Sequence, residues 1–206
     1  LKLGASTTIA QYVLPPLLAS FIGKFPQVNL SLLNGNSREI EAALQEHRID
    51  LGFVEGVFRL PNIKYTTFLE DELVAVVRTG SRLTVGEEIT PEELLHLPLV
   101  LRERGSGTLD VFERALQQHN IKLSSLQVLM YLGSTESIKL FWEHTDCLGI
   151  VSIRSITREL YSGQLRVVEI KGMPMLRDFS FAQPQGQESG LAQVFMQFAM
   201  HNNNKL

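Results

Sequence analysis

Apolar runs typical of strands alternate along this chain with segments in which apolar residues recur at helical spacing. The strand-like runs are 1–6, 28–33, 49–56, two runs within 63–80, 97–101, 128–133, 147–153, 166–170 and 177–184. The helical segments are 13–25, 37–47, 90–94, 111–116, 134–144, 154–163 and 191–199. This alternation predicts an α/β fold, in which nearly continuous apolar strands form a parallel sheet that is covered on both faces.

Start and stop signals agree with this division. Pro15 and Pro16 fit only in the first turn of the first helix, because an interior proline breaks the helical hydrogen-bond pattern. Asn36 and Glu39 have capping-box spacing at the start of the next helix, and Gly163 lies where a helix C-cap is expected. The chain therefore reads as a series of strand, turn and helix units.

The order of elements repeats in the second half of the chain, which predicts two lobes of similar architecture. A length of 206 residues, 44% of them hydrophobic, is enough for two compact cores. If the C-terminal helix packs on the first lobe, residues 1–72 and 182–206 form lobe I and residues 73–181 form lobe II. The chain then crosses between the lobes twice, near 70–76 and 176–184, and the two crossover strands form a hinge.

The charge of the chain excludes strong nucleic-acid affinity for this segment alone. It carries 19 basic and 22 acidic residues, a net charge of −3, and no run of Lys or Arg. The only cysteine, Cys147, lies among apolar residues and is expected in the core, so a disulfide within the chain is excluded. No apolar run has the length of a membrane helix, and the first residues do not resemble a signal peptide, so we expect a cytoplasmic protein without membrane contact.

Hydroxyl side chains cluster where three predicted strands are followed by helices. The clusters comprise Ser6, Thr7 and Thr8; then Gly105, Ser106, Gly107 and Thr108; and finally Ser134 and Thr135. Helix N-termini attract anions through unpaired N–H groups, and ligands of open α/β sheets bind beyond the carboxyl ends of the strands. Arg102 adds a cation able to bind a carboxylate or oxyanion in bidentate geometry. The sequence therefore predicts a polar cleft for a small anion.

Plain helix capping is the alternative for each cluster taken singly, because Ser and Thr are preferred N-cap residues. The presence of three clusters at strand ends favours a ligand site. Asn36 and Glu55 also lie at strand ends. Asn36 is better explained as a helix cap than as a ligand contact. For Glu55 three roles are equally plausible: an ion pair with an arginine, the rejection of larger anions, or contact with the ligand.

The sequence predicts no catalytic residue, no metal site and no cofactor. It has no nucleophile elbow, no Walker phosphate-binding loop and no H-E-x-x-H motif, and its five histidines are scattered. The segment GSGTLD begins like a dinucleotide fingerprint, but Asp110 stands where the third glycine is needed, which excludes NAD and FAD. A cleft that binds charge without a matched acid and base is expected to bind rather than to catalyse.

The chain resembles the effector-binding domain of LysR-type transcriptional regulators across essentially its whole length. The resemblance is carried by an ordered series of segments: LKLGASTTIAQYVLPPLLASFIGKFPQV, LSLLNGNSREIEAAL, IDLGFVEG, FLEDELVAVV, LVLRERGSGT and LGSTESIK. It implies two Rossmann-like lobes of periplasmic-binding-protein type II, joined by two crossover strands, with a small-molecule inducer in the cleft. It also implies self-association as antiparallel dimers of effector domains, a tetrameric regulator, and DNA contact only through an N-terminal winged helix-turn-helix domain. That domain is missing here, and a chain that opens inside a strand is expected to continue a longer protein.

Carried over position by position, the resemblance assigns inducer contacts to Ser6, Thr8, Ser106, Thr108 and Thr135. The predicted effector site also includes their neighbours Thr7, Arg102 and Gly107, with Asn36, Glu55 and Ser134 as second-tier candidates. The segments FVEG, RERGSGT and GSTESIK look most similar to regulators of sulfur and inorganic-anion metabolism, which implies an oxyanion such as sulfite or sulfate. A periplasmic-type solute-binding protein is the alternative function, and a dehydratase-like enzyme of related architecture is a more distant one.

Overall fold

The chain folds into two compact units. The computed structural model describes residues 1–57, 59–186 and 190–202. Unit 1 comprises Leu1–Glu70, Gly105–Gly107 and Asp178–Leu206, and unit 2 comprises Asp71–Arg104 and Thr108–Arg177. The strands β4 (Ile63–Arg78) and β10 (Leu176–Pro184) contribute to both units.

This division differs from the sequence-based one, 1–72 with 182–206 and 73–181, by a few residues in β4 and β10 and by one tripeptide. Gly105–Gly107 belongs to unit 1 because its backbone lies against the residues that follow β2 and β3. The Gly105 carbonyl oxygen accepts a hydrogen bond from the Arg38 N–H at 3.3 Å. The assignment of the units to two regulatory lobes stays a prediction.

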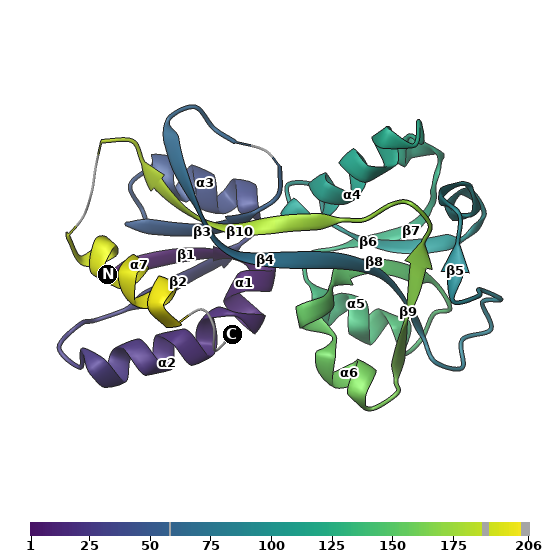
Figure 1. Cartoon of the computed structure of the whole chain (residues 1–206), viewed down its shortest axis with the longest axis horizontal. Helices are drawn as coiled ribbons and strands as arrows, with labels where there is room; N and C mark the ends of the chain where they lie inside the picture. The colour runs from purple at the N-terminus through teal and green to yellow at the C-terminus, as the bar shows by residue number, and fades with distance from the viewer. Residues whose placement is uncertain (58, 187–189, 203–206) are drawn as a thin grey trace. The chain divides into compact units, whose positions relative to one another are not determined.

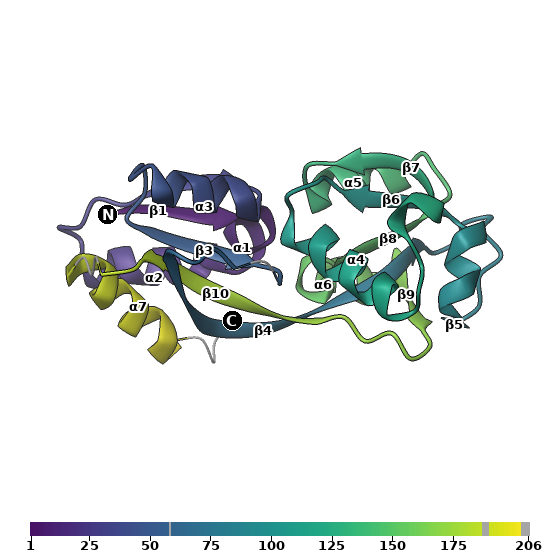
Figure 2. The same cartoon turned by 90° about the horizontal axis from the view of Figure 1, so that it is seen from above.

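Unit 1 is built on a mainly parallel sheet. Its strands, in spatial order, are β2 (Ser31–Gly35), β1 (Lys2–Ser6), β3 (Leu51–Glu55) and β10, of which only β10 runs antiparallel. Its helices are α1 (Thr7–Tyr12), α2 (Leu14–Lys24), α3 (Ser37–Gln45) and α7 (Gly190–Asn202). Helix α3 lies on one face of the sheet and α2 with α7 on the other, so the strands are buried on both sides (Figures 1 and 2).

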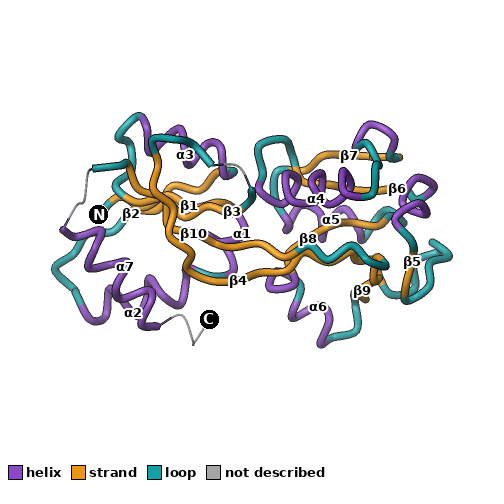
Figure 3. The backbone as a smooth tube through the Cα atoms, turned by 45° about the horizontal axis from the view of Figure 1, so that its top comes forward, coloured by secondary structure: helices purple, strands orange, loops and turns teal. Residues whose placement is uncertain are grey.

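Unit 2 repeats this arrangement with a second parallel set of strands. Three of its strands run parallel: β8 (Leu148–Ser152), β6 (Pro98–Arg102) and β7 (Gln127–Leu132). The second half of β4 pairs antiparallel with β8 and with β9 (Leu165–Ile170). The short strand β5 (Glu88–Ile89) pairs with β9. The α-helices are α4 (Gly107–Gln118), α5 (Thr135–Trp142) and α6 (Thr157–Tyr161), and the 3₁₀ helices are Pro91–His96, Leu123–Ser125 and Ile153–Ser155. Helices α4 and α5 lie on opposite faces of this sheet (Figure 1), and their apolar residues pack into separate core clusters. Figure 3 marks the helices and strands of both units by colour.

The α/β fold predicted from the sequence is confirmed, with local corrections. The prolines begin α2 as expected, but a short extra helix, α1, directly follows β1, so Thr7 and Thr8 are helical rather than part of a turn. The two strand runs expected in 63–80 form one strand of 16 residues, because both crossover strands continue from one unit into the other. The expected helix at 90–94 is a 3₁₀ helix.

The capping signals are confirmed by geometry. The Glu39 N–H donates to Asn36 Oδ1 at 3.0 Å, and the Asn36 N–H donates to Glu39 Oε2 at 2.7 Å, which is a complete capping box. Gly163 follows α6 with a φ of +70°, the left-handed conformation that a glycine C-cap supplies.

Gly149 gives the sharpest test of packing in unit 2. A Cβ at this position in β8 would overlap the indole ring of Trp142, which is fully buried. We expect Gly149→Ala to lower the free energy of unfolding by roughly 1–3 kcal/mol, the usual cost of overpacking a core, in chemical denaturation. Gly23→Ala is the matched control, because Gly23 lies in α2 with no atom near its added methyl, and it should stabilise by up to about 1 kcal/mol. A Gly149→Ala protein as stable as the wild type would contradict this packing.

Candidate functional site

The carboxyl ends of the parallel strands of unit 1 lie at one edge of the sheet. β1 ends at Ser6, which is in register with Gly35 at the end of β2, and β3 ends at Glu55. Side chains that follow these strands are therefore gathered at the edge where ligands of open α/β sheets bind.

Ser6 and Thr7 use their hydroxyl protons inside unit 1. The Ser6 hydroxyl donates to Glu55 Oε2 at 2.5 Å, and both residues are buried. The Thr7 hydroxyl donates to the Gly35 carbonyl oxygen at 3.1 Å. Glu55 thus has a serine among its partners, and Ser6 retains only its lone pairs for a ligand.

Thr8 differs from its neighbours because its hydroxyl makes no hydrogen bond. The residue is 1% exposed, and Oγ1 has no partner in the described part of the chain. A buried hydroxyl that gives up water without gaining a protein partner costs about 1–3 kcal/mol. Thr8 therefore carries an unused hydrogen-bonding group at the carboxyl edge of the sheet.

The tripeptide Gly105–Gly107 lies tightly against the same edge. A Cβ on Gly107 would overlap the Glu55 carbonyl oxygen, so no other residue fits there without a shift of the backbone. Gly105 has a φ of +92°, and a Cβ added to it would lie 3.1 Å from Asn36 Oδ1. Ser106, which lies between the two glycines, is buried. Asn36 is the N-cap of α3, which confirms the capping role predicted from the sequence.

In unit 2, Arg102 ends β6 and is also 1% exposed. Its Nε and Nη2 donate to the two carboxylate oxygens of the neighbouring Glu103, at 2.8 and 3.1 Å. The remaining nitrogen, Nη1, is buried and has no partner among the described residues. One arm of a fixed cation is therefore available as a donor.

Thr108 is the second residue of α4, Thr135 is the first residue of α5, and both are buried. Thr108 Oγ1 accepts a hydrogen bond from Nη1 of Arg177 at 3.0 Å. In the described ranges no group accepts its hydroxyl proton. Ser134 precedes Thr135 and accepts from the Ser137 N–H at 3.1 Å, so capping explains its side chain.

The domain model that matches this chain is the LysR substrate binding domain, over residues 1–203. The chain belongs to this family. The "Uncharacterized HTH-type transcriptional regulator YeiE" of Escherichia coli (strain K12) is 35% identical over 170 residues, which is 82% of this chain and 57% of the regulator. The HTH-type transcriptional activator CmpR of Synechocystis is 30% identical and is matched over 94% of this chain and 63% of its own length. The chain thus spans less than two thirds of these two regulators.

A solved structure agrees with this membership. The CcmR regulatory domain of Synechocystis PCC6803, in complex with 2-PG, superposes with a TM-score of 0.86 at 27% identity, over 98% of this chain and 95% of that one. The two-lobe periplasmic-binding-protein type II fold expected from the sequence is the fold of this family. None of the helices in the described part of the chain has the length and apolar character needed to cross a bilayer.

Sequence reasoning missed two charged residues of this LysR substrate-binding domain. Asp71 in β4 and Arg177 in β10 form an ion pair whose side chains are both fully buried. In the sequence, each of them is only a charged residue at the edge of an apolar strand-like run, and this pattern does not show that the two side chains pair with each other. The pair lies beside Thr108, whose hydroxyl Arg177 contacts.

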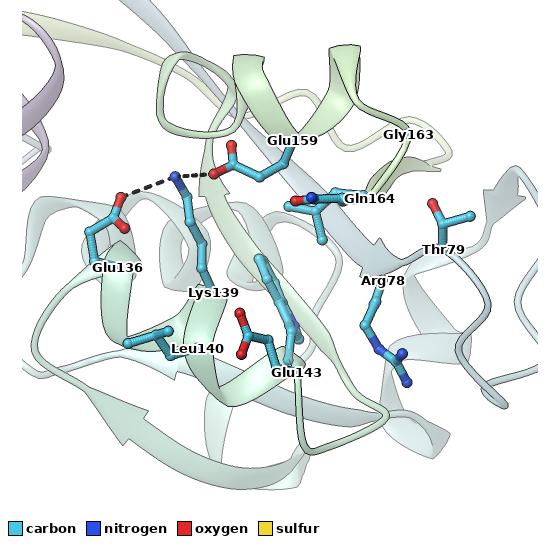
Figure 4. A pocket seen from close by; sticks show the side chains of 11 residues that line it. Arg78, Thr79, Glu136, Lys139, Leu140, Glu143, Glu159, Gly163 and Gln164 are labelled. Carbon is cyan, nitrogen blue, oxygen red and sulfur yellow. Dashed lines mark hydrogen bonds and ion pairs between the residues drawn. The ribbon is translucent and has the colours of Figure 1, made fainter.

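A cavity of about 540 Å³ on the α5 side of unit 2 is a second candidate site (Figure 4). Lys139 lies in its wall with Nζ between Glu136 Oε1 and Glu159 Oε1, at 3.0 and 2.8 Å, and Arg78 pairs with Asp146 at 3.1 Å. Both cations of the wall therefore already have carboxylate partners, and an incoming anion would have to displace them. None of the predicted effector residues lines this cavity.

The described residues hold no cluster of three or more potential metal ligands among His, Cys, Asp and Glu. Cys147 is buried in the core, which confirms its sequence-based interpretation. Burial, with a smaller contribution from the charge of Asp146, raises the pKa of the Cys147 thiol to about 11. The thiolate that a nucleophilic cysteine needs is therefore nearly absent at neutral pH.

We expect Cys147 to resist a thiol reagent in the folded domain. With a pKa of about 11, roughly one thiol in a thousand is ionised at pH 8, and the side chain is enclosed by the core. Ellman's reagent at pH 8 should react slowly with native protein and fully within minutes in guanidinium chloride. Native protein that reacts as fast as the unfolded chain would show an exposed, activated thiol.

Proposed function

We propose that this LysR substrate-binding domain senses a small anionic effector for a cytoplasmic transcriptional regulator. The effector contacts would be Ser6, Thr7, Thr8, Ser106 and Gly107 in unit 1, and Arg102, Thr108 and Thr135 in unit 2. In the full-length protein the domain would self-associate, as a dimer within a tetramer, and an N-terminal DNA-binding domain would contact DNA. The HTH-type regulators that are similar to this chain support this reading over a transport protein.

The observation that carries the proposal is the set of buried polar groups without protein partners. Thr8 Oγ1 and Arg102 Nη1 have none in the described part of the chain, and the Thr108 hydroxyl keeps its proton unused. Arginine nitrogens only donate, and a threonine that accepts a hydrogen bond from an arginine still has its proton to donate, beside one remaining lone pair. Unused donors of this kind favour a ligand rich in acceptor oxygens, and the 2-PG bound to CcmR supports a small ligand for the family.

The same groups favour a sensor over an enzyme. A buried guanidinium and hydroxyls bind an oxyanion, but neither is an acid or base matched to a reaction at neutral pH. Binding alone is enough for regulation, because an effector that prefers one conformation shifts the population toward it by its differential affinity. Sulfite and sulfate are the first ligands to test, and phosphate is the isosteric comparison.

Thr8→Val tests the proposal through two effects of opposite sign. Valine keeps the shape of threonine and removes the unpartnered hydroxyl, so the ligand-free domain should become more stable by about 1 kcal/mol. The same change should weaken binding of the anion that stabilises the wild type best, measured by thermal shift and calorimetry with sodium sulfate, sulfite and phosphate at constant ionic strength.

Thr7→Val is the matched control, because the Thr7 hydroxyl already donates to the Gly35 carbonyl, so that Thr7 would contact the effector through its backbone N–H, which valine keeps. It should cost stability and leave anion affinity nearly unchanged. The account fails if none of the three anions stabilises the wild type beyond sodium chloride, or if Thr8→Val binds the anion as the wild type does.

A further inference from the structure

Four side chains of unit 2 form one buried hydrogen-bond network. The Ser152 hydroxyl donates to Asp71 Oδ1 at 2.7 Å, and Arg177 Nε donates to Asp71 Oδ2 at 2.7 Å. Arg177 Nη1 extends the network by donating to Thr108 Oγ1 at 3.0 Å. The Asp71 carboxylate thus holds the guanidinium in a fixed orientation, with one nitrogen directed at Thr108.

Three residues of this network lie where the polypeptide enters or leaves unit 2. Asp71, on β4, is the first residue of unit 2, and Arg177, on β10, is the last. Thr108 is the residue at which the polypeptide re-enters unit 2 after the tripeptide Gly105–Gly107. Ser152 ends β8 at the carboxyl edge of the sheet. A single network therefore joins both crossover strands to the start of α4.

The direction of these hydrogen bonds fixes what Thr108 offers to a ligand. A guanidinium has five donor hydrogens and no acceptor, so Thr108 Oγ1 must be the acceptor in its bond with Arg177. The threonine O–H then points away from Arg177, and no described residue accepts it. The bond occupies one of the two lone pairs of Oγ1, so Thr108 has its proton and one lone pair left for a ligand. Without Arg177, the hydroxyl would be free to rotate and both lone pairs would be open, so it would accept from a ligand more readily than it does beside Arg177.

We propose that Arg177 is the positioning residue that sets Thr108 as a hydrogen-bond donor and so selects effectors that present an acceptor oxygen to α4. This inference rests on the proposed function, because it needs an effector at Thr108. Arg177 acts through Thr108 and through its pairing with Asp71. A merely structural ion pair would contribute to stability without any effect that depends on the Thr108 hydroxyl.

A double-mutant cycle separates these two roles. Arg177→Lys keeps a cation for Asp71 but lacks the forked guanidinium that also reaches Thr108, and Thr108→Val removes the hydroxyl. Sodium sulfate and sodium sulfite are titrated into the wild type, both single variants and the double variant by calorimetry. We expect each single variant to lose roughly tenfold in affinity, the effect of one hydrogen bond to a charged group. Arg177→Lys should have no further effect in the Thr108→Val background.

Ser152→Ala is the matched control, because it removes the other hydrogen bond of Asp71 and leaves the Arg177 to Thr108 contact in place. It should lower the melting temperature of the ligand-free domain and keep the wild-type affinity. If Arg177→Lys does not fold, Asp71→Asn combined with Arg177→Met replaces it in the cycle, because this pair of changes removes both fully buried charges together. Arg154, whose Nε lies 3.8 Å from Asp71 Oδ1, loses that contact but is partly exposed to solvent.

The outcomes distinguish this inference from the function on which it rests. Losses that add in the double variant, or an Arg177 variant with wild-type affinity, overturn the positioning role while anion sensing stands. A wild type that binds neither anion, or a Thr108→Val variant with unchanged affinity, overturns the role of Thr108 in sensing and the inference with it.

Discussion

Parallel strand pairing is the constraint on which both parts of this domain depend. Parallel strands end at the same edge of a sheet, and each is followed by a connection to a helix on one face. In unit 1 this brings Ser6 and Glu55 within a hydrogen bond, although 49 residues separate them in the chain. In unit 2 it brings the end of β6 at Arg102 into register with the end of β7 at Leu132. The polar residues that follow the strands are therefore gathered by the pairing itself.

The polar groups at these edges fall into two kinds. Ser6, Thr7, Asn36 and Ser134 have partners within the protein and are explained by the stability of their own units. Thr8, Thr108 and Arg102 retain donors that the described protein does not use, and they stay buried at a cost in free energy. In the function proposed above, an effector with acceptor oxygens would recover that free energy, which would link a lower stability without effector to affinity for it.

Local features were predictable from the sequence and long-range pairs were not. The Asn36 and Glu39 capping box and the strand and helix order depend on residues within a few positions of each other, and these were confirmed. Helix α1 was missed because the prolines mark the start of α2 and give no sign of a separate helix before it. The network of Asp71 and Arg177 joins residues 106 positions apart, and nothing local in the sequence specifies that pairing. The assignment of effector contacts stays a prediction.

Methyl NMR of threonine tests the central claim most directly, because the proposed effector contacts include Thr8, Thr108 and Thr135. With threonine methyl groups labelled, sodium sulfate or sulfite is titrated into the domain, and Thr66, Thr84 and Thr157 serve as internal references away from the strand ends. The account predicts that the signals of Thr8, Thr108 and Thr135 shift together along one saturation curve with a single dissociation constant. Signals that stay unmoved at saturation, or that titrate with different constants in the two units, would contradict it.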